Sequence, residues 1–186
     1  MAKLDRATPL AGTGLERAGL CVAENTGLGL IRLQAFHRRP GAVEELTARL
    51  GIEPPGPGSL RSERDRQWFW SAPGEWLIAI PAGTEDAVLG ALRAQLDGLF
   101  VVLSAITDSQ VALDITGEAV REVLARGSTV DFHPASFGAG NCVLTRFAGV
   151  PVMLASPGRG EQILLFADRS LARYLLDWFE AASIDC

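Results

Sequence analysis

His133 and Asp131 are the pair of side chains in this sequence with the clearest chemical potential. They stand two residues apart in the segment Val130–Pro134, so in an extended backbone the carboxylate and the imidazole project to the same side. A carboxylate that orients an imidazole is suited to proton transfer. The alternative interpretation, which we favour, is structural, with the pair fixing the loop ahead of Pro134. The second histidine, His37, lies at a strand end among basic residues, without a carboxylate near it in sequence.

Other motifs that would indicate a catalytic or cofactor site are absent from the sequence. It contains no G-x-S-x-G nucleophile turn, no phosphate-binding loop and no G-x-G-x-x-G dinucleotide motif. Cys21, Cys142 and Cys186 are far apart and lack a C-x-x-C spacing, and two scattered histidines cannot supply the three or four ligands of a metal site. We therefore expect no catalytic, cofactor-binding or metal-binding residue in this chain.

A cluster of tryptophans is better suited to recognition or to core packing. Trp68 and Trp70 flank Phe69 on one predicted strand, so the two indoles face one side of the strand and Phe69 faces the other. Trp76 follows just beyond a predicted turn. Burying such a ring removes roughly 150–250 Å² from water. The ring can be buried in the core or under a partner chain, and the sequence leaves both destinations open.

Composition argues against several classes of partner. With 17 basic and 22 acidic residues, the net charge of -5 has the wrong sign for a protein that neutralises nucleic-acid phosphates. No stretch approaches the roughly 18 to 20 consecutive apolar residues that cross a bilayer, and the N-terminus lacks the apolar segment of an export signal. We therefore expect a cytoplasmic protein without a nucleic-acid or membrane partner. The mean hydropathy of +0.19 indicates apolar surface that another chain covers.

Hydrophobic periodicity and turn residues predict the elements that must carry these side chains. Residues 1–26 show no sustained period and predict an extended arm, whereas residues 27–186 predict one domain with two similar halves, about 27–98 and 99–182. Hairpins and helical crossovers in each half favour an α+β fold of two split βαβ, ferredoxin-like halves. The predicted strands are 28–36, 67–71, 75–81, 100–106, 110–116, 141–147, 150–155 and 162–167; the predicted helices end at Leu50, lie between Thr84 and Gly98, span 118–126, and begin at Asp168 or Ser170.

Several motifs in series resemble those of one known family. They are Trp70–Leu77 (WSAPGEWL), Asp108-Ser109, Arg121–Gly127 (REVLARG), Val130–Pro134 (VDFHP), Phe137, Thr145-Arg146 and Arg169–Trp178 (RSLARYLLDW). In this order and spacing they look like the gamma subunit of heterotetrameric sarcosine oxidase, over about residues 8–182. One departure is Arg126-Gly127-Ser128 where the family is expected to have Lys-Gly-Cys, which weakens any redox or metal role there. The chain also lacks the K-G-C-Y-x-G-Q-E motif of iron–sulfur maturation proteins with the same fold.

The resemblance implies a fold related to the folate-binding domain of glycine-cleavage aminomethyltransferases. It also implies a non-catalytic role in a complex that oxidatively demethylates sarcosine to glycine, forms H2O2 and passes the one-carbon unit to tetrahydrofolate. FAD, FMN, NAD, tetrahydrofolate and zinc would then be held by the alpha, beta and delta partner subunits, and none by this chain. The residues expected at an interface, or at a channel to folate, are Trp68, Trp70, Glu75, Trp76, Asp108, Asp131, His133 and Arg146.

Two alternatives remain open. A free-standing folate-binding, aminomethyltransferase-like protein would need a carboxylate near the pterin, for which Asp108 is the candidate, and a pocket of at least about 300 Å³. A homo-oligomeric structural domain would self-associate. A deep pocket containing Asp108 would favour the folate-binding protein, whereas a filled centre and an exposed apolar patch would favour the partner subunit.

Overall fold

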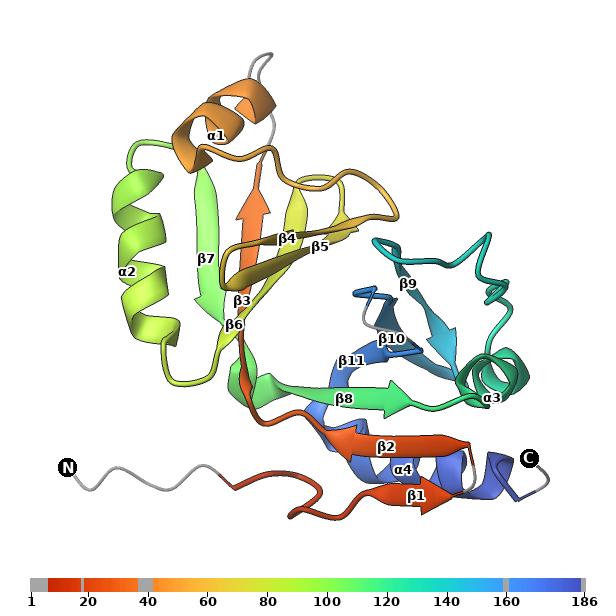
Figure 1. Ribbon diagram of the computed structural model, residues 1–186. Helices are drawn as coiled ribbons and strands as arrows, with labels where there is room; N and C mark the ends of the chain where they lie inside the picture. Colours follow the sequence, from red (N-terminus) through yellow and green to blue (C-terminus); the bar gives the residue numbers. More distant parts are fainter. Residues whose placement is uncertain (1–6, 18, 37–41, 159–160, 185–186) are drawn as a thin grey trace.

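A computed structural model describes residues 7–17, 19–36, 42–158 and 161–184 of the chain. Two antiparallel sheets pack face to face, and two helices cover the outer face of each sheet, which gives the molecule four layers (Figure 1). The predicted α+β fold class is confirmed. The interpretation of His37 lies outside the described residues.

The five-stranded sheet holds the first half of the chain. Its strands, in spatial order, are β4 (Leu60–Glu63), β5 (Arg66–Ala72), β6 (Glu75–Pro81), β3 (Leu28–Ala35) and β7 (Val101–Ala105). Its helices are α1 (Ala42–Leu50), which follows β3, and α2 (Glu85–Gln95), which connects β6 to β7. Because β6 pairs antiparallel with both β3 and β5, those two strands run parallel with β6 between them, as in a split βαβ unit.

The six-stranded sheet holds the second half together with the N-terminal segment. Its strands, in spatial order, are β1 (Leu15–Arg17), β2 (Leu20–Glu24), β8 (Gln110–Thr116), β11 (Ile163–Asp168), β10 (Val150–Ala155) and β9 (Cys142–Phe147). Its helices are α3 (Val120–Gly127) and α4 (Ala172–Ala182), and short 3-10 turns at Thr107–Ser109 and Arg169–Leu171 precede β8 and α4. Here β8 and β10 run parallel with β11 between them, which repeats the arrangement of the first half.

The two halves place equivalent strands in equivalent positions, except that one strand of the second half comes from the N-terminal segment. In the first half β7 lies beside β3, and in the second half the corresponding place beside β8 is taken by β2 from the N-terminal segment. The structure thus differs from the arm predicted over residues 1–26, because Leu15, Leu20 and Val22 bury their side chains in the second half's core. The half boundary also moves, since β7 joins the first sheet although its residues follow the predicted boundary at 98.

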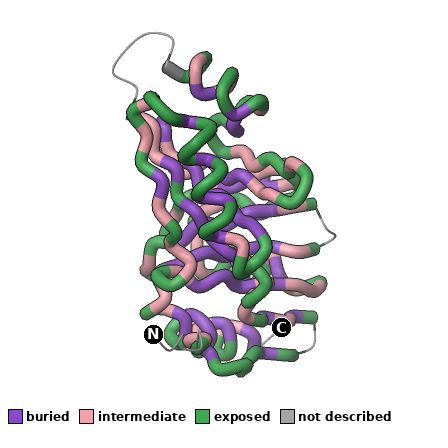
Figure 2. Tube along the Cα trace, turned by 90° about the vertical axis from the view of Figure 1, so that its left-hand side faces the viewer, coloured by how far each residue is buried: buried purple, intermediate pink, exposed green. Residues whose placement is uncertain are grey.

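Three apolar clusters hold the layers together. One lies between the five-stranded sheet and helices α1 and α2, and contains Trp68. A second lies between the six-stranded sheet and helices α3 and α4, where the rings of Phe147 and Phe179 stack 5.1 Å apart. The third lies between the sheets, where Phe69 meets Phe166 with ring centroids 5.2 Å apart. Figure 2 shows the buried residues concentrated along the strands and the exposed ones on the outer helices and turns.

Thr84 and Gly127 lie at the helix ends where they were predicted, but their roles there differ from the expected ones. Thr84 precedes α2 as predicted, but its hydroxyl donates to the Pro81 carbonyl at 2.7 Å and makes no side-chain cap bond. Gly127 is the last residue of α3, and space requires glycine there, since a Cβ would lie 2.5 Å from the Phe147 ring and 2.8 Å from the Trp178 ring. The glycine therefore serves the aromatic packing between α3, β9 and α4.

Asp168, one of the two predicted N-cap residues, caps the 3-10 turn that precedes α4. The Asp168 carboxylate accepts hydrogen bonds from the Ser170 hydroxyl and backbone N–H, at 2.5 and 2.9 Å, and these bonds lower the pKa of the carboxyl. On the predicted apolar face of α4, Leu175 and Phe179 are buried. Tyr174 is half exposed and its hydroxyl donates to the Ala148 carbonyl at 2.6 Å, which ties the helix to the β9–β10 turn.

Candidate functional site

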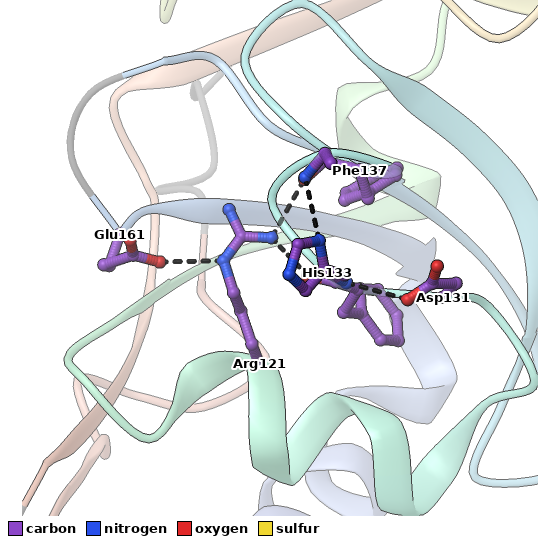
Figure 3. Close-up of polar contacts among 7 residues, drawn as sticks. Arg121, Asp131, His133, Phe137 and Glu161 are labelled. Carbon is purple, nitrogen blue, oxygen red and sulfur yellow. Dashed lines mark hydrogen bonds and ion pairs between the residues drawn. The ribbon is translucent and has the colours of Figure 1, made fainter.

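Arg121 organises the loop of residues 128–141, which follows α3. Its Nη1 donates to the backbone carbonyls of Phe132 and Phe137, at 2.5 and 2.9 Å (Figure 3). Its Nε donates to the Glu161 carboxylate at 2.9 Å. A guanidinium that bonds two carbonyls of one loop and a carboxylate of another fixes both backbones. Sequence reasoning recorded Arg121 as part of a family motif but missed this role.

Within this loop, Asp131 and His133 fix the backbone. The Asp131 carboxylate accepts from the His133 backbone N–H at 2.9 Å and from the Ser136 hydroxyl at 2.6 Å. The Ser136 hydrogen bond, and after it the one from the His133 backbone, lowers the pKa of the Asp131 carboxyl. The His133 Nδ1 accepts from the Ala135 N–H at 3.2 Å, so the neutral ring carries its proton on Nε2. This geometry agrees with the structural interpretation of the pair.

Two buried aromatic rings anchor the same loop. Phe132 and Phe137 meet edge to face, with centroids 5.6 Å apart and planes at 83°. Both rings pack into the cluster beneath α3 and α4. Asn141 closes the loop by accepting from the Gly138 N–H at 2.9 Å. The loop therefore presents the exposed His133 side chain on a base that packing and hydrogen bonds hold in place.

The tryptophans divide between the core and its boundary. Trp68 and Trp76 are 1% and 5% exposed, inside the cluster between the five-stranded sheet and its helices. Trp76 Nε1 donates to the Pro55 carbonyl at 2.9 Å and ties the loop after α1 to the sheet. Trp70 is partly buried and packs against both this cluster and the one between the sheets. The sequence left open whether the tryptophans are buried in the core or under a partner chain, and Trp68 and Trp76 are buried in the core.

The remaining predicted site residues lie apart from the loop. The Glu75 carboxylate accepts from Gln34 Nε2 at 2.8 Å, on the inner side of the five-stranded sheet. Asp108 is exposed on the 3-10 turn before β8. Arg146 is exposed on β9 and donates to the carbonyl of Gly149. The structure thus divides the predicted residues between the core and several separate parts of the described surface.

The cavities among the described residues include three with volumes of 280, 270 and 510 Å³. The first has a polar lining that includes Arg66 and Gln67, the second lies between the sheets and includes Glu75, and the third includes Arg146. Asp108 is not among the residues that line these three. The space between the sheets is otherwise filled by the cluster around Phe69.

A polar clamp that sequence reasoning missed joins the N-terminal segment to the second half. The Asp114 carboxylate accepts from Asn25 Nδ2 at 2.9 Å and from Gln162 Nε2 at 2.8 Å. Asn25 in turn accepts from the Gly27 N–H at 3.0 Å. Because each partner comes from a different part of the chain, no local sequence pattern could have revealed the clamp.

An exposed apolar corner was also missed. Phe36, Phe100 and Val102 are 45%, 74% and 45% exposed, and the two rings lie 5.3 Å apart. They lie where β3 ends and β7 begins. The sequence feature that could have indicated this corner is the apolar run of residues 99–106, in which Ser104 is the one polar residue. Such a run predicts a buried strand, and here Phe100, Val102 and Ala105 face solvent.

Metal-ligating side chains and one buried thiol can be placed among the described residues of the chain. Across those residues, no three His, Cys, Asp or Glu side chains gather as a metal site would require. Cys142 is buried, its Sγ donates to the Ser59 carbonyl at 3.0 Å, and burial raises the pKa of its thiol to about 11. Among the helices of the described ranges, none has the length and hydropathy to cross a membrane.

Comparison with known protein sequences gives a consistent picture. The model of the "Sarcosine oxidase, gamma subunit family" matches residues 39–185. A curated sarcosine oxidase subunit gamma from Arthrobacter sp. is 28% identical over 112 residues, which cover 59% of this chain and 54% of that protein. The chain therefore spans about half the length of this relative.

Comparison with solved structures relates the fold to two proteins. A chain of the heterotetrameric sarcosine oxidase from Corynebacterium sp. U-96 superposes with a TM-score of 0.80 at 21% identity, over 95% of this chain and 94% of that one. The glycine cleavage system aminomethyltransferase T from Bartonella henselae superposes with a TM-score of 0.62 at 17% identity, over 88% of this chain and 46% of that one. At these identities the likeness establishes the fold, as expected from the sequence.

Proposed function

This chain belongs to the sarcosine oxidase gamma subunit family, and we propose that it acts as the non-catalytic gamma subunit of a heterotetrameric sarcosine oxidase. In this proposal the complex oxidatively demethylates sarcosine to glycine, releases H2O2 and delivers the one-carbon unit to tetrahydrofolate. FAD, FMN, NAD, tetrahydrofolate and zinc belong to the alpha, beta and delta partner subunits. The gamma chain contributes stability to the assembly.

The observation that carries this proposal is the apolar cluster packed between the sheets, together with the exposed apolar corner. Phe69 and Phe166 meet in the middle of the interlayer cluster, and the 270 Å³ cavity beside it is lined mainly by apolar side chains. Asp108, the carboxylate that a folate-binding protein would place near the pterin, lies outside that cavity's lining. A domain with a filled centre and exposed aromatic rings is suited to packing against other chains.

The loop from Asp131 to Asn141 is the part that we assign to a partner subunit or to the channel that leads to folate. Its backbone is fixed by Arg121, and it presents the exposed side chains of Asp131 and His133. Fixed loops with exposed polar side chains are typical recognition surfaces. In the proposal, these side chains face a partner subunit or the channel that leads to folate.

Co-expression with the alpha, beta and delta subunits tests the proposal. We expect a stable flavin-containing complex that retains this chain through affinity purification and produces peroxide when sarcosine is added. Omission of this chain should make the complex dissociate or lose activity. A chain that stays alone and binds tetrahydrofolate, measured by titration calorimetry, would instead identify a free-standing folate-binding protein.

A further inference from the structure

The outer edges of the two sheets differ in charge. Charged side chains on edge strands discourage pairing with other chains. Strand β7, at one edge of the five-stranded sheet, reads VVLSA and contains neither charge nor proline. The sequence of β7 therefore contains no residue that would discourage pairing with a strand of another chain. The edge strands β1, β9 and β4 all carry charged residues, namely Glu16, Arg17, Arg146, Arg61 and Glu63.

The hydrogen-bond pattern shows which backbone groups of β7 point outward. The Phe36 N–H donates to the Phe100 carbonyl, and the antiparallel register with β3 continues from there along β7. Bonding alternates along an antiparallel ladder, so even-numbered residues of β7 bond to β3 and odd-numbered residues point to the opposite side. The N–H and C=O groups of Leu103 and Ala105 thus point away from the sheet, and no strand in the described part of the chain pairs with them.

The other half of the molecule shows how this position is filled when the chain itself supplies a strand. There β2 is the equivalent of β7, and β1 pairs antiparallel with its outer edge from Leu15 opposite Val22 to Arg17 opposite Leu20. Among the described residues, the first half has no counterpart of β1. One position in a repeated architecture is therefore occupied in one half and open in the other.

The side chains next to the open position are apolar. Val102 projects from β7 and Phe100 just precedes it, and the tilted rings of Phe36 and Phe100 have centroids 5.3 Å apart. A strand added beside β7 would place its own side chains next to those of Phe100 and Val102. Backbone bonding at the edge and apolar contact beside it favour the same occupant, an extended segment with uncharged side chains.

We propose that β7 is the docking edge of this chain, and that an extended, uncharged segment of a partner subunit pairs with it in the position that β1 occupies in the other half. This inference rests on the proposed function, because it requires a partner subunit. Ladder hydrogen bonds to Leu103 and Ala105 set the register, and Phe100 and Val102 supply the apolar contact.

Amide hydrogen exchange gives the first test, with the full chain measured alone and in the co-expressed complex with the alpha, beta and delta subunits. Protection of the Leu103 and Ala105 amides should rise by about a hundredfold or more on assembly, because each gains a ladder bond. The Val102 amide, which already bonds to β3, should be protected in both states and serves as the internal control. Unchanged exchange at Leu103 and Ala105 in an intact complex would overturn the inference while leaving the proposed function in place.

Two substitutions give the second test. Ala105→Pro removes an outward donor without removing a bond to β3, and Phe100→Asp places a charge beside the edge. Each should weaken retention of the chain in the complex by about tenfold or more, with little change in its own thermal unfolding. Ile184→Asp is the matched control, because Ile184 is an apolar residue of similar exposure, 66%, on the segment after α4. If Ala105→Pro perturbs folding, Phe100→Asp alone decides, since its side chain is 74% exposed.

The remaining outcomes separate the two proposals. Variants that bind as well as the wild type would overturn the docking edge alone. A wild-type chain that enters no complex would overturn the proposed function and, with it, the partner assigned to β7. A chain that dimerises by itself, with the dimer lost in Ala105→Pro when measured by light scattering, would assign the edge to a second copy and overturn the partner strand.

Discussion

The two halves of the molecule share one arrangement of strands and helices but complete it in different ways. In the first half, β7 follows α2 directly and ends the sheet with an uncharged edge. In the second half, β2 and β1 from the N-terminal segment take the corresponding place, and the edge carries Glu16 and Arg17. The comparison teaches that one topology can produce a sheet closed by its own chain and a sheet left open for another.

The largest expected effect comes from placing the same charge in the two equivalent strands. Val22 on β2 is fully buried, so Val22→Asp should lower the free energy of unfolding by about 3–5 kcal/mol. Val102→Asp on β7 should change it by less than about 1 kcal/mol, because that side chain is already half exposed. Urea unfolding of the isolated chain measures both. Equal losses of unfolding free energy in the two variants would show that the side chains of β7 are as buried as those of β2.

A smaller effect is expected from adding a methyl group at a helix in each half. Gly127→Ala would push a Cβ against the rings of Phe147 and Trp178, and should cost about 1–3 kcal/mol. Gly90→Ala on α2 is the matched control, since nothing lies within 4 Å of the added Cβ. It should stabilise the chain by about 0.5–1 kcal/mol through helix propensity. Thermal unfolding that shows the same sign for both would contradict the aromatic packing at Gly127.

The loops after α1 and α3 allow a third comparison. Arg121→Met leaves the Phe132 and Phe137 carbonyls without their donor and should cost roughly 1–2 kcal/mol. Trp76→Phe removes the indole bond to the Pro55 carbonyl together with one of the two fused rings, and should cost about 1–2 kcal/mol. Limited proteolysis should locate the loosened segment in each variant. Cleavage between residues 128 and 141 in Arg121→Met, and not in Trp76→Phe, would confirm that each loop has its own clamp.

The smallest expected effect concerns pH and the exposed turn at Asp131. Its folded-state pKa lies below the ordinary value, so its hydrogen bonds to Ser136 and His133 stabilise the fold above the unfolded-state pKa, near 3.9. That contribution is lost as the pH falls through the folded-state pKa. The melting temperature of Asp131→Asn should therefore be below that of the wild type at pH 6, and the gap should shrink towards pH 3. A gap that is constant across this range would show that the carboxylate charge has no part in the turn.

Much of the fold could be predicted from sequence, because its elements are local. The strands 75–81 and 110–116 end where predicted, since turn residues and alternating side chains mark them. β1 and β2 could not be predicted, because three and five residues carry little periodicity and the pairing of β2 with β8 is non-local. In the candidate site, too, local features could be predicted and non-local ones could not. The turn at Asp131 was visible within a few residues, whereas the role of Arg121 depends on loops that sequence does not place.

The pairing of β2 with β8 also sets the order in which the chain can fold. Asn25 and Asp114, which hydrogen-bond across these strands, are 89 residues apart. At about 5–20 residues per second, synthesis separates them by roughly 5–20 s. Throughout that interval Leu15, Leu20 and Val22 have no sheet to join, so a segment made well before β8 is fixed only after β8 is complete. The apolar side chains of β2 therefore stay in contact with water until β8 has been made.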